Sequence, residues 1–283
     1  MNELALFAGA GGGILGGKLL GWRTVCAVEI DDYARRVLMA RQDDGSLPPF
    51  PIWDDIRTFD GKPWRGVVDI ITGGFPCQDI SVAGTGKGLD GARSGLWTKM
   101  ARTICEVGPR YVLVENSPAL TARGLGRVLG DLAALGYDAR WGVLGAVDAG
   151  GPHRRERIWI VAHAQLPERW PLGGACHGLA RSDGLPQRQE SAGRIGGCGE
   201  ALAHADSLRE LQPSGHHAEG WRRPCDGGWW AAEPDVGRMA HGVASRVDRL
   251  RCLGNGQVPA VVALAWTILT ENQFKPFLNE RTI

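Results

Sequence analysis

The sequence contains no apolar run of the roughly 20 residues that a membrane-spanning helix needs. Its first residues, MNELALFAG, lack the basic stretch that opens a secretory leader. These two absences favour a cytoplasmic protein with no membrane partner. The net charge is only +1, so overall charge gives no support for a nucleic-acid partner and does not exclude one. The case for any partner therefore rests on the chemistry of individual sites.

Residues 165–245 lack the cysteine and histidine spacing that is typical of a zinc site. No C-x₂-C or H-x₃₋₅-H pattern occurs there, and structural zinc sites depend on such spacings. We therefore expect no metal site. The side chains concerned are Cys176, His177, Cys198, His204, His216, His217 and Cys225.

Short apolar runs alternate with helix-like stretches from residue 1 to about residue 162. Alternation of this kind predicts an α/β fold, with a mostly parallel sheet and helices on both of its faces. The expected strands, rich in β-branched or bulky residues, are Leu4–Phe7, Thr24–Glu29, Val67–Thr72, Tyr111–Glu115 and Ile158–Ala162. The expected helices are Asp31–Gln42, Gly95–Val107 and Leu120–Leu135.

The composition changes near residue 163. From 165 to 245 the chain is dense in glycine and proline, has no lysine and shows little periodicity. We predict a first domain over residues 1–164, a small loop-rich subdomain over 165–245, and a segment, 246–283, that returns to the first domain. Within this last segment Arg246–Leu253 and Val258–Thr270 are typical of ordered structure, and Pro259 suits the first turn of a closing helix.

A glycine-rich turn follows the first expected strand. Gly11-Gly12-Gly13-Ile14-Leu15-Gly16 satisfies the pattern G-x-G-x-x-G, and glycines there let the backbone approach a ligand closely. Glu29, at the end of the next strand, is placed to bind the hydroxyl groups of a ribose. The pattern fits NAD, FAD or another adenosine cofactor, and a glycine-rich turn without a ligand stays open as an alternative.

The segment Gly73-Gly74-Phe75-Pro76-Cys77-Gln78 follows another expected strand, Val67–Thr72. This places it at the carboxyl edge of the sheet, where open α/β folds bind ligands. Its glycines and proline form a sharp loop that presents the thiol of Cys77. By position alone, such a cysteine is more often an inert core residue than a nucleophile. The whole string, however, resembles the catalytic loop of the DNA (cytosine-5)-methyltransferases of bacterial and phage restriction-modification systems.

The resemblance continues, in order, over about two thirds of the chain. The other matching segments are Leu6–Gly12, Glu29-Ile30, Asp55-Ile56, Gly91–Leu96, Glu115-Asn116, Arg155–Arg157 and Gly254–Pro259. The resemblance implies a Rossmann-like fold, S-adenosyl-L-methionine as the cofactor and double-stranded DNA as the substrate. It also implies that residues 1–164 bind the cofactor and carry out catalysis, and that residues 165–245 form a target-recognition subdomain.

The resemblance assigns roles to individual side chains. Cys77 is the expected nucleophile, Glu115 is expected to stabilise the target base through N3, and Arg155 or Arg157 to bind the base carbonyl. The implied cofactor contacts are Phe7, Ala8, Gly9, Gly11, Gly12, Glu29, Ile30, Asp55, Ile56, Gly74, Pro76, Leu96, Asn255 and Val258. The expected DNA contacts are Gln78, Ser81, Arg93, Arg181, Arg222 and Arg223.

The chemistry of cytosine explains these residue types. Its C5 atom is not nucleophilic enough to attack a sulfonium methyl group. Addition of a thiolate at C6 turns the ring into an enamine, whose C5 atom is nucleophilic enough. The target base must first leave the helical stack, at a cost of a few kcal/mol. The small, glycine-rich stretch Ser81–Gly88 is therefore predicted to close over the DNA and fill the gap.

Three positions depart from the family's usual pattern. Ala5 stands where Asp is usual, His153 where Gln is usual, and Ser117 where Val is usual. The first two changes are expected to weaken cofactor or base positioning, and none removes a group that makes or breaks a bond. Two other functions stay open: a tRNA cytosine-5-methyltransferase and a catalytically inactive DNA-binding homologue. We expect a monomer, and a cognate restriction endonuclease encoded elsewhere is a candidate partner.

Overall fold

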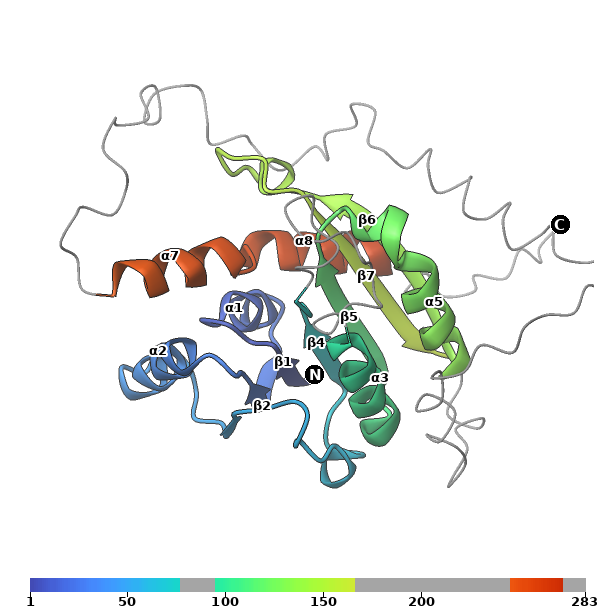
Figure 1. Cartoon of the computed structure of the whole chain (residues 1–283), viewed down its shortest axis with the longest axis horizontal. Coiled ribbons are helices and arrows are strands. Elements are labelled where there is room, and N and C mark those ends of the chain that lie inside the picture. The colour runs from blue at the N-terminus through green and yellow to red at the C-terminus, as the bar shows by residue number, and fades with distance from the viewer. Residues whose placement is uncertain (77–94, 166–244, 272–283) are drawn as a thin grey trace, which may run out of the picture. The chain divides into compact units, whose positions relative to one another are not determined.

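The computed structural model describes residues 1–76, 95–165 and 245–271 (Figure 1). All of them belong to one compact unit of the chain. The predicted target-recognition subdomain and the stretch Ser81–Gly88 lie outside the described residues. The same holds for one predicted catalytic residue and all predicted DNA contacts, namely Cys77, Gln78, Ser81, Arg93, Arg181, Arg222 and Arg223.

A seven-stranded sheet in the order β3-β2-β1-β4-β5-β7-β6 forms the centre of this unit. Strands β1 to β5 pair in parallel, whereas β7 is antiparallel to both of its neighbours, β5 and β6. The predicted α/β fold with a mostly parallel sheet is therefore confirmed. The strands are β1 (Asn2–Leu6), β2 (Arg23–Val28), β3 (Ile52–Trp53), β4 (Ile70–Gly73), β5 (Tyr111–Asn116), β6 (Tyr137–Leu144) and β7 (Arg157–Ala164).

The five predicted strands are present, and two further strands were not predicted. Strand β3 has only two residues, too few to give an apolar pattern. Strand β6 lies at the edge of the sheet, and six of its eight residues are partly buried or exposed, so its sequence lacks a continuous apolar run. Strand β1 ends at Leu6, one residue earlier than predicted, because Phe7 turns into the left-handed region with φ 53°.

Seven α-helices and two short 3₁₀ turns are present among the described residues. They are α1 (Gly12–Leu19), α2 (Asp32–Asp43), η1 (Lys62–Trp64), α3 (Leu96–Val107), α4 (Leu120–Arg123), α5 (Leu125–Ala134), η3 (Val147–Ala149), α7 (Arg246–Asn255) and α8 (Pro259–Thr270). The single helix predicted over Leu120–Leu135 is in fact two helices, because the backbone of Gly124 leaves the helical region with φ 175° and ψ −4°.

Local signals in the sequence account for several helix ends. Asp31 caps α2, and its side chain accepts a hydrogen bond from the backbone N–H of Ala34 at 3.0 Å. Helix α3 ends at Val107 and is followed by Gly108, whose φ of 62° suits a residue without a Cβ. Pro259 occupies the first turn of α8, as predicted.

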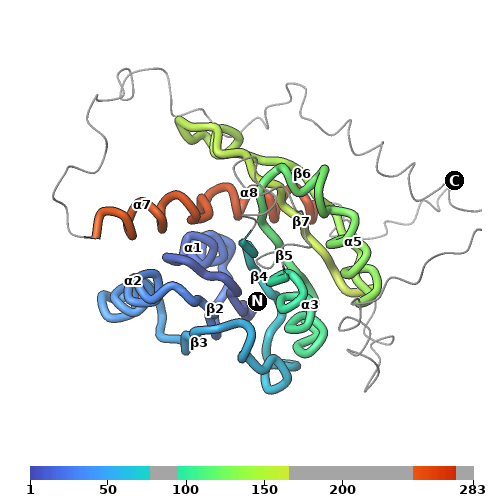
Figure 2. Tube along the Cα trace, viewed as in Figure 1, coloured from blue at the N-terminus to red at the C-terminus, as the bar shows by residue number. Residues whose placement is uncertain are grey.

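The helices cover both faces of the sheet (Figure 2). On one face, side chains of β1, β4 and β5 such as Leu4 and Val112 pack in a single cluster with residues of α3 and α5. On the opposite face Ile70 and Leu113 pack with α8, and Ala5 packs with α1 and α2. The alternation of side chains along each strand therefore buries both faces, as expected for a parallel sheet.

Helix α1 was not predicted, because four of its eight residues are glycine and glycine disfavours a helix. Its glycines allow close packing against α8. A Cβ on Gly16 would lie only 2.5 Å from the Cβ of Val262. Tertiary packing thus stabilises a helix that its own sequence does not favour.

Residues Arg246–Thr270, which form α7 and α8, are long and apolar enough by length and composition to cross a membrane. In this fold apolar residues of α8 pack in the protein core. Val261, Val262 and Ala265 are almost fully buried in the cluster that covers one face of the sheet. Packing in the core therefore accounts for the composition of α8.

Glu3 is a charged residue type at a completely buried position in β1. Its carboxyl group accepts hydrogen bonds from the hydroxyl groups of Thr24 and Thr72, each at 2.7 Å. Burial raises its pKa from an ordinary 4.5 to about 7, although both hydroxyl groups act in the opposite direction. The folded chain therefore holds this proton at pH values where the unfolded chain has already lost it. Its contribution to stability is complete below about pH 4.5 and is lost as the pH rises through about 7.

We expect Glu3→Gln to abolish this pH dependence. Between pH 4 and pH 8 ionisation of Glu3 should lower the free energy of unfolding of the unaltered protein by about 3 kcal/mol. The variant, which cannot ionise there, should lose far less. Urea unfolding over a series of pH values measures both slopes, and equal slopes would show that Glu3 ionises alike in the folded and unfolded chains.

Candidate functional site

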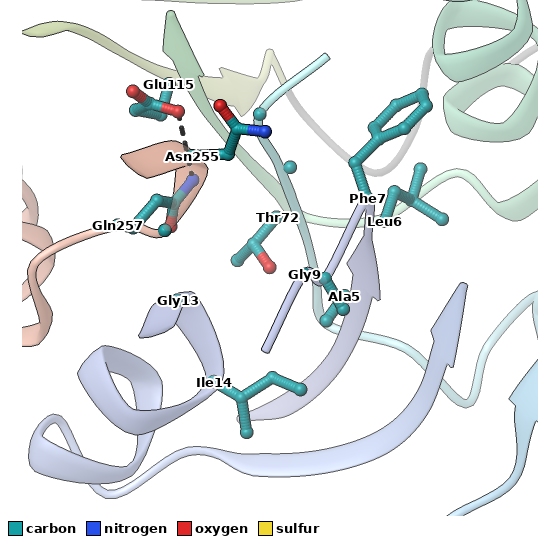
Figure 3. A pocket seen from close by; sticks show the side chains of 14 residues that line it. Ala5, Leu6, Phe7, Gly9, Gly13, Ile14, Thr72, Glu115, Asn255 and Gln257 are labelled. Atoms are coloured by element: carbon teal, nitrogen blue, oxygen red, sulfur yellow. Dashed lines mark hydrogen bonds between the residues drawn. The ribbon is translucent and has the colours of Figure 1, made fainter. Parts of the chain in front are cut away.

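A pocket lies at the carboxyl ends of β1 and β4, between the glycine-rich turn and the connection from α7 to α8 (Figure 3). Its volume is about 400 Å³, part of it open to solvent. The lining residues are Ala5, Leu6, Phe7, Ala8, Gly9, Gly13, Ile14, Thr72, Gly73, Gly74, Glu115, Asn255, Gly256 and Gln257.

Glu29 fixes the glycine-rich turn on one side of this pocket. One oxygen of its carboxyl group accepts a hydrogen bond from the backbone N–H of Gly9 at 2.6 Å, and the other accepts one from Asp31 at 2.7 Å. Burial raises the pKa of Glu29, and these backbone donors act against the rise. Gly9 and Gly11 both have positive φ, which glycine adopts without strain. A largely buried acid and a pre-shaped turn are thus held together at the end of β2.

The connection between α7 and α8 packs directly onto the start of α1. A Cβ on Gly12 would lie 2.2 Å from the backbone oxygen of Gln257, and one on Gly13 would lie 2.5 Å from the Gln257 Oε1 atom. Only glycine fits at these two positions without displacing Gln257. The glycine run therefore allows Gln257, which is far away in the sequence, to close one side of the pocket.

Gly12→Ala should open this contact. The added methyl group would overlap the backbone oxygen of Gln257, and relieving the overlap requires a shift of the backbone. We expect a loss of about 1–3 kcal/mol in the free energy of unfolding, typical of overpacking. Gly130→Ala in α5 is the matched control, because nothing lies within 4 Å of its added Cβ, and it should be neutral or stabilising. Similar melting temperatures for the two variants would contradict the contact.

Glu115 lies at the end of β5 with its carboxyl group largely buried. Its Oε1 atom pairs with Arg157 Nε at 3.0 Å, and its Oε2 atom accepts a hydrogen bond from Gln257 Nε2 at 3.4 Å. Burial raises its pKa, and Arg157, Gln257 and Arg155 act against the rise. A buried carboxyl group of raised pKa at the mouth of a pocket keeps its proton to higher pH than an ordinary glutamate, and this suits it to act as a proton donor.

The first residues of the predicted loop Gly73–Gln78, the Pro-Cys loop, lie against Glu115 and its neighbour. A Cβ on Gly74 would be 2.5 Å from the Glu115 Oε2 atom. The side chain of Asn116, buried at the end of β5, donates a hydrogen bond to the backbone oxygen of Phe75 at 3.2 Å. The ring of Phe75 packs against Trp97 of α3, with 5.4 Å between ring centroids. Strand β5 therefore fixes the backbone two residues before Cys77.

The two predicted catalytic arginines make different contacts. Arg157 pairs with Glu115 and also donates to the backbone oxygen of Glu156 at 2.7 Å. Arg155 donates to the backbone oxygen of Gly254 at 2.7 Å and to that of Gly256. Of the two, Arg157 is the one that contacts the buried carboxyl group, whereas Arg155 holds the connection between α7 and α8.

Several predicted cofactor residues lie outside the lining of this pocket. Ile30 exposes 61% of its surface directly after Glu29. Asp55 pairs with Arg57 at 2.7 Å, a contact that lowers the pKa of Asp55. The side chain of Ile56 is buried in the main core cluster, and its backbone oxygen accepts a hydrogen bond from Arg102 at 2.8 Å. Leu96 packs on the same cluster.

The remaining predicted contacts are close in sequence to residues that line the pocket. Gly11 precedes α1, and Pro76 is partly buried next to Phe75. Val258 precedes α8. Among the predicted residues, those that line the pocket are Phe7, Ala8, Gly9, Gly74, Glu115 and Asn255.

The three departures from the usual pattern have different surroundings. Ala5 is buried and lines the pocket, so the missing carboxyl group would have faced it. Ser117 is partly buried, and its backbone N–H donates to the Asn116 side chain at 2.7 Å. His153 is exposed in the loop between β6 and β7.

Gln257, Thr72 and Gly13 line the pocket, although no role was predicted for them from the sequence. Gly13 stands within the G-x-G-x-x-G pattern, and Gln257 stands within the segment Gly254–Pro259. A signal therefore existed for these two. Thr72 is the third residue of β4 and has no signal beyond its place near a strand end.

Comparison with known proteins gives a family and a fold. The pattern of the C-5 cytosine-specific DNA methylase family matches residues 1–181. The type II methyltransferase M.Eco47II from Escherichia coli is 35% identical over 166 residues, which are 56% of this chain and 38% of that protein. The type II methyltransferase M.NgoBI from Neisseria gonorrhoeae is 38% identical over 175 residues, 60% of this chain and 53% of that protein. The chain thus matches between about two fifths and half of the length of these relatives.

Among solved structures, the methyltransferase EhMeth from Entamoeba histolytica aligns with a TM-score of 0.57 at 12% identity. The alignment covers 97% of this chain and 99% of that chain. At this identity the likeness supports the α/β fold alone.

Proposed function

Because the chain belongs to the C-5 cytosine-specific DNA methylase family, we propose that it transfers a methyl group to C5 of a flipped cytosine in double-stranded DNA. The observation that carries the proposal is the approach of Gly74 to the buried carboxyl group of Glu115. This approach brings the start of the Pro-Cys loop to an acid of raised pKa at the mouth of a pocket. Both reactive groups that the chemistry needs would then stand on adjacent strand ends.

The residues around the pocket fit S-adenosyl-L-methionine. Glu29 would bind the ribose hydroxyl groups, and the exposed side chain of Ile30 offers an apolar surface for the adenine. Asp55 would bind the adenine amino group after release of Arg57, which holds both carboxylate oxygens of Asp55. When bound, the cofactor supplies a methyl group from its sulfonium centre. Phe7, Ala8, Gly9, Gly11, Gly12, Gly74, Pro76, Leu96, Asn255 and Val258 complete the proposed cofactor contacts.

The chain's own residues would act on the target base in sequence. The Cys77 thiolate forms a bond to C6, and Glu115 donates a proton to N3 as negative charge builds on the ring. Arg157 keeps Glu115 in place and contacts the base carbonyl, while Arg155 supports the connection that closes the pocket. After C5 has gained its methyl group, the ring loses the C5 proton to water and expels Cys77 as a thiolate. N3 then returns its proton to the Glu115 carboxylate, which restores the acid for the next turnover.

The remaining parts of the proposal concern the DNA and the cell. Residues 165–245 would select the target sequence in the major groove. We propose a cytoplasmic monomer, with a cognate restriction endonuclease as a candidate partner. The proposed DNA contacts are Gln78, Ser81, Arg93, Arg181, Arg222 and Arg223.

Methylation of a duplex oligonucleotide library, set against a tRNA pool, tests the proposal. We expect radioactive methyl label in the duplex DNA, and bisulfite sequencing of that DNA then gives the target sequence. Label in tRNA alone would replace DNA by tRNA as the substrate. Cofactor and DNA binding without label in either pool would identify an inactive DNA-binding homologue.

A further inference from the structure

Gln257 spans the distance between the glycine-rich turn and the buried acid. Its Nε2 atom donates a hydrogen bond to Glu115 Oε2 at 3.4 Å and would lie 3.2 Å from a Cβ on Gly74. Its Oε1 atom lies over Gly13, at the start of α1, and its backbone oxygen lies over Gly12. Figure 3 shows the Gln257 side chain reaching Glu115 from the connection between α7 and α8.

The electrostatics on both sides favour this orientation of the amide. The NH₂ group faces a carboxyl oxygen of Glu115, which accepts hydrogen bonds. The Oε1 atom faces the first turn of α1, where backbone N–H groups lack partners within the helix and carry partial positive charge. Rotating the amide by half a turn would place oxygen against oxygen at Glu115. The donor is therefore directed at the acid by its surroundings on both sides.

We propose that Gln257 is a positioning residue that holds the Glu115 carboxyl group in its catalytic orientation and links it to the cofactor pocket. The proposal rests on the function proposed above. With Arg157 on Oε1 and Gln257 on Oε2, each carboxyl oxygen of Glu115 has one donor. The side chain is thereby fixed in one rotamer. Gln257 also packs on Gly12 and Gly13. A change in the backbone of the glycine-rich turn would therefore move Gln257 and, through its side chain, Glu115.

The charges that face Glu115 among the described residues define the expected effect. Arg157, at the start of β7, and Arg155, just before it, both favour the ionised carboxylate, and so does the Gln257 amide. Loss of the amide donor removes one of these three influences and leaves burial unchanged. The pKa of Glu115 should then rise further above its ordinary value.

The direct test is the pKa of Glu115 in the full chain, measured by ¹³C NMR with labelled glutamate, with Glu115→Gln identifying the resonance. Gln257→Met keeps the length of the side chain but removes the donor. We expect the pKa of Glu115 to rise by about 0.5–1 unit. Gln257→Glu, which places a second carboxyl group there, should raise it more.

Gln42→Met is the matched control. The Gln42 side chain donates one hydrogen bond to the backbone oxygen of Phe50 at 2.9 Å, away from the pocket lining. It should lower the melting temperature without changing the pKa of Glu115. An unchanged pKa in both Gln257→Met and Gln257→Glu, when both are folded, would overturn the proposal, and a lower melting temperature alone would show a merely structural role.

Kinetics separate this proposal from the proposed function. Gln257→Met should lower kcat for DNA methylation about tenfold with little change in KM, and its activity should decline at a higher pH than that of the unaltered protein. If the unaltered protein methylates no DNA while the pKa of Glu115 still rises in Gln257→Met, the proposed function fails and the contact stands. Equal kcat values and pH profiles in an active pair would refute the positioning role.

Discussion

Cys77→Ser should reduce methyl transfer to duplex DNA by at least about 10⁴-fold, the scale of loss seen when a covalent nucleophile is removed. Serine keeps the shape of the side chain, but its hydroxyl group is far less acidic than a thiol and is a poor nucleophile without an adjacent base. The C6 adduct would not form, so C5 would never gain the electron density to accept a methyl group. Transfer of a tritiated methyl group to a duplex substrate measures the loss.

The control for this variant is Cys252→Ser. Cys252 is a free, partly exposed thiol on α7, and its replacement should leave the rate within about twofold. Both variants should bind DNA and cofactor. Methylation by Cys77→Ser at a rate comparable to that of the unaltered protein would exclude a Cys77 adduct and leave the reaction without its nucleophile.

Glu115→Gln should lower kcat by about 10²–10⁴-fold, the range for loss of a general acid. The amide keeps the size of the side chain and its ability to form hydrogen bonds, but it has no acidic proton to give to N3 of the base. Because burial raises the pKa of Glu115, the protonated, active form persists to higher pH than for an ordinary glutamate. Activity of the unaltered protein should therefore decline only as the pH rises through this raised pKa.

Glu156→Gln is the matched control for Glu115→Gln, since Glu156 is exposed one residue before Arg157. It should retain its kcat. Single-turnover rates with saturating cofactor and duplex DNA measure the chemical step for both variants. Equal single-turnover rates for Glu115→Gln and the unaltered protein would remove Glu115 from the reaction.

The sequence predicted those elements whose residues agree with their tertiary environment. Strand β5, for example, begins with the continuous apolar run Tyr111–Val114 because both faces of the sheet are covered. Helix α1 was not predicted because its glycines have low helix propensity. They allow close contact with α8 and Gln257 instead. Strand β6 was not predicted because an edge strand can be partly polar.

For the site, sequence motifs located Glu115, Glu29 and the glycine-rich turn, but not the contacts among them. The bond between Arg155 and Gly254 joins residues 99 positions apart, and the bond between Gln257 and Glu115 joins residues 142 positions apart. The pairing of Asp55 with Arg57 is local, yet only coordinates show that Arg57 holds the carboxylate. Contacts of this kind depend on how the chain folds back, which periodicity and spacing do not encode.

The covalent step can be observed directly with a duplex in which 5-fluorocytosine replaces the target cytosine, because fluorine at C5 prevents the proton loss that would release the enzyme. With S-adenosyl-L-methionine present, mass spectrometry of the digested complex should find the methylated base attached to the peptide that contains Cys77. Cys77→Ser should give no such adduct. An enzyme that methylates ordinary cytosine but forms no adduct with the fluorinated base, or forms it on another residue, would contradict the account.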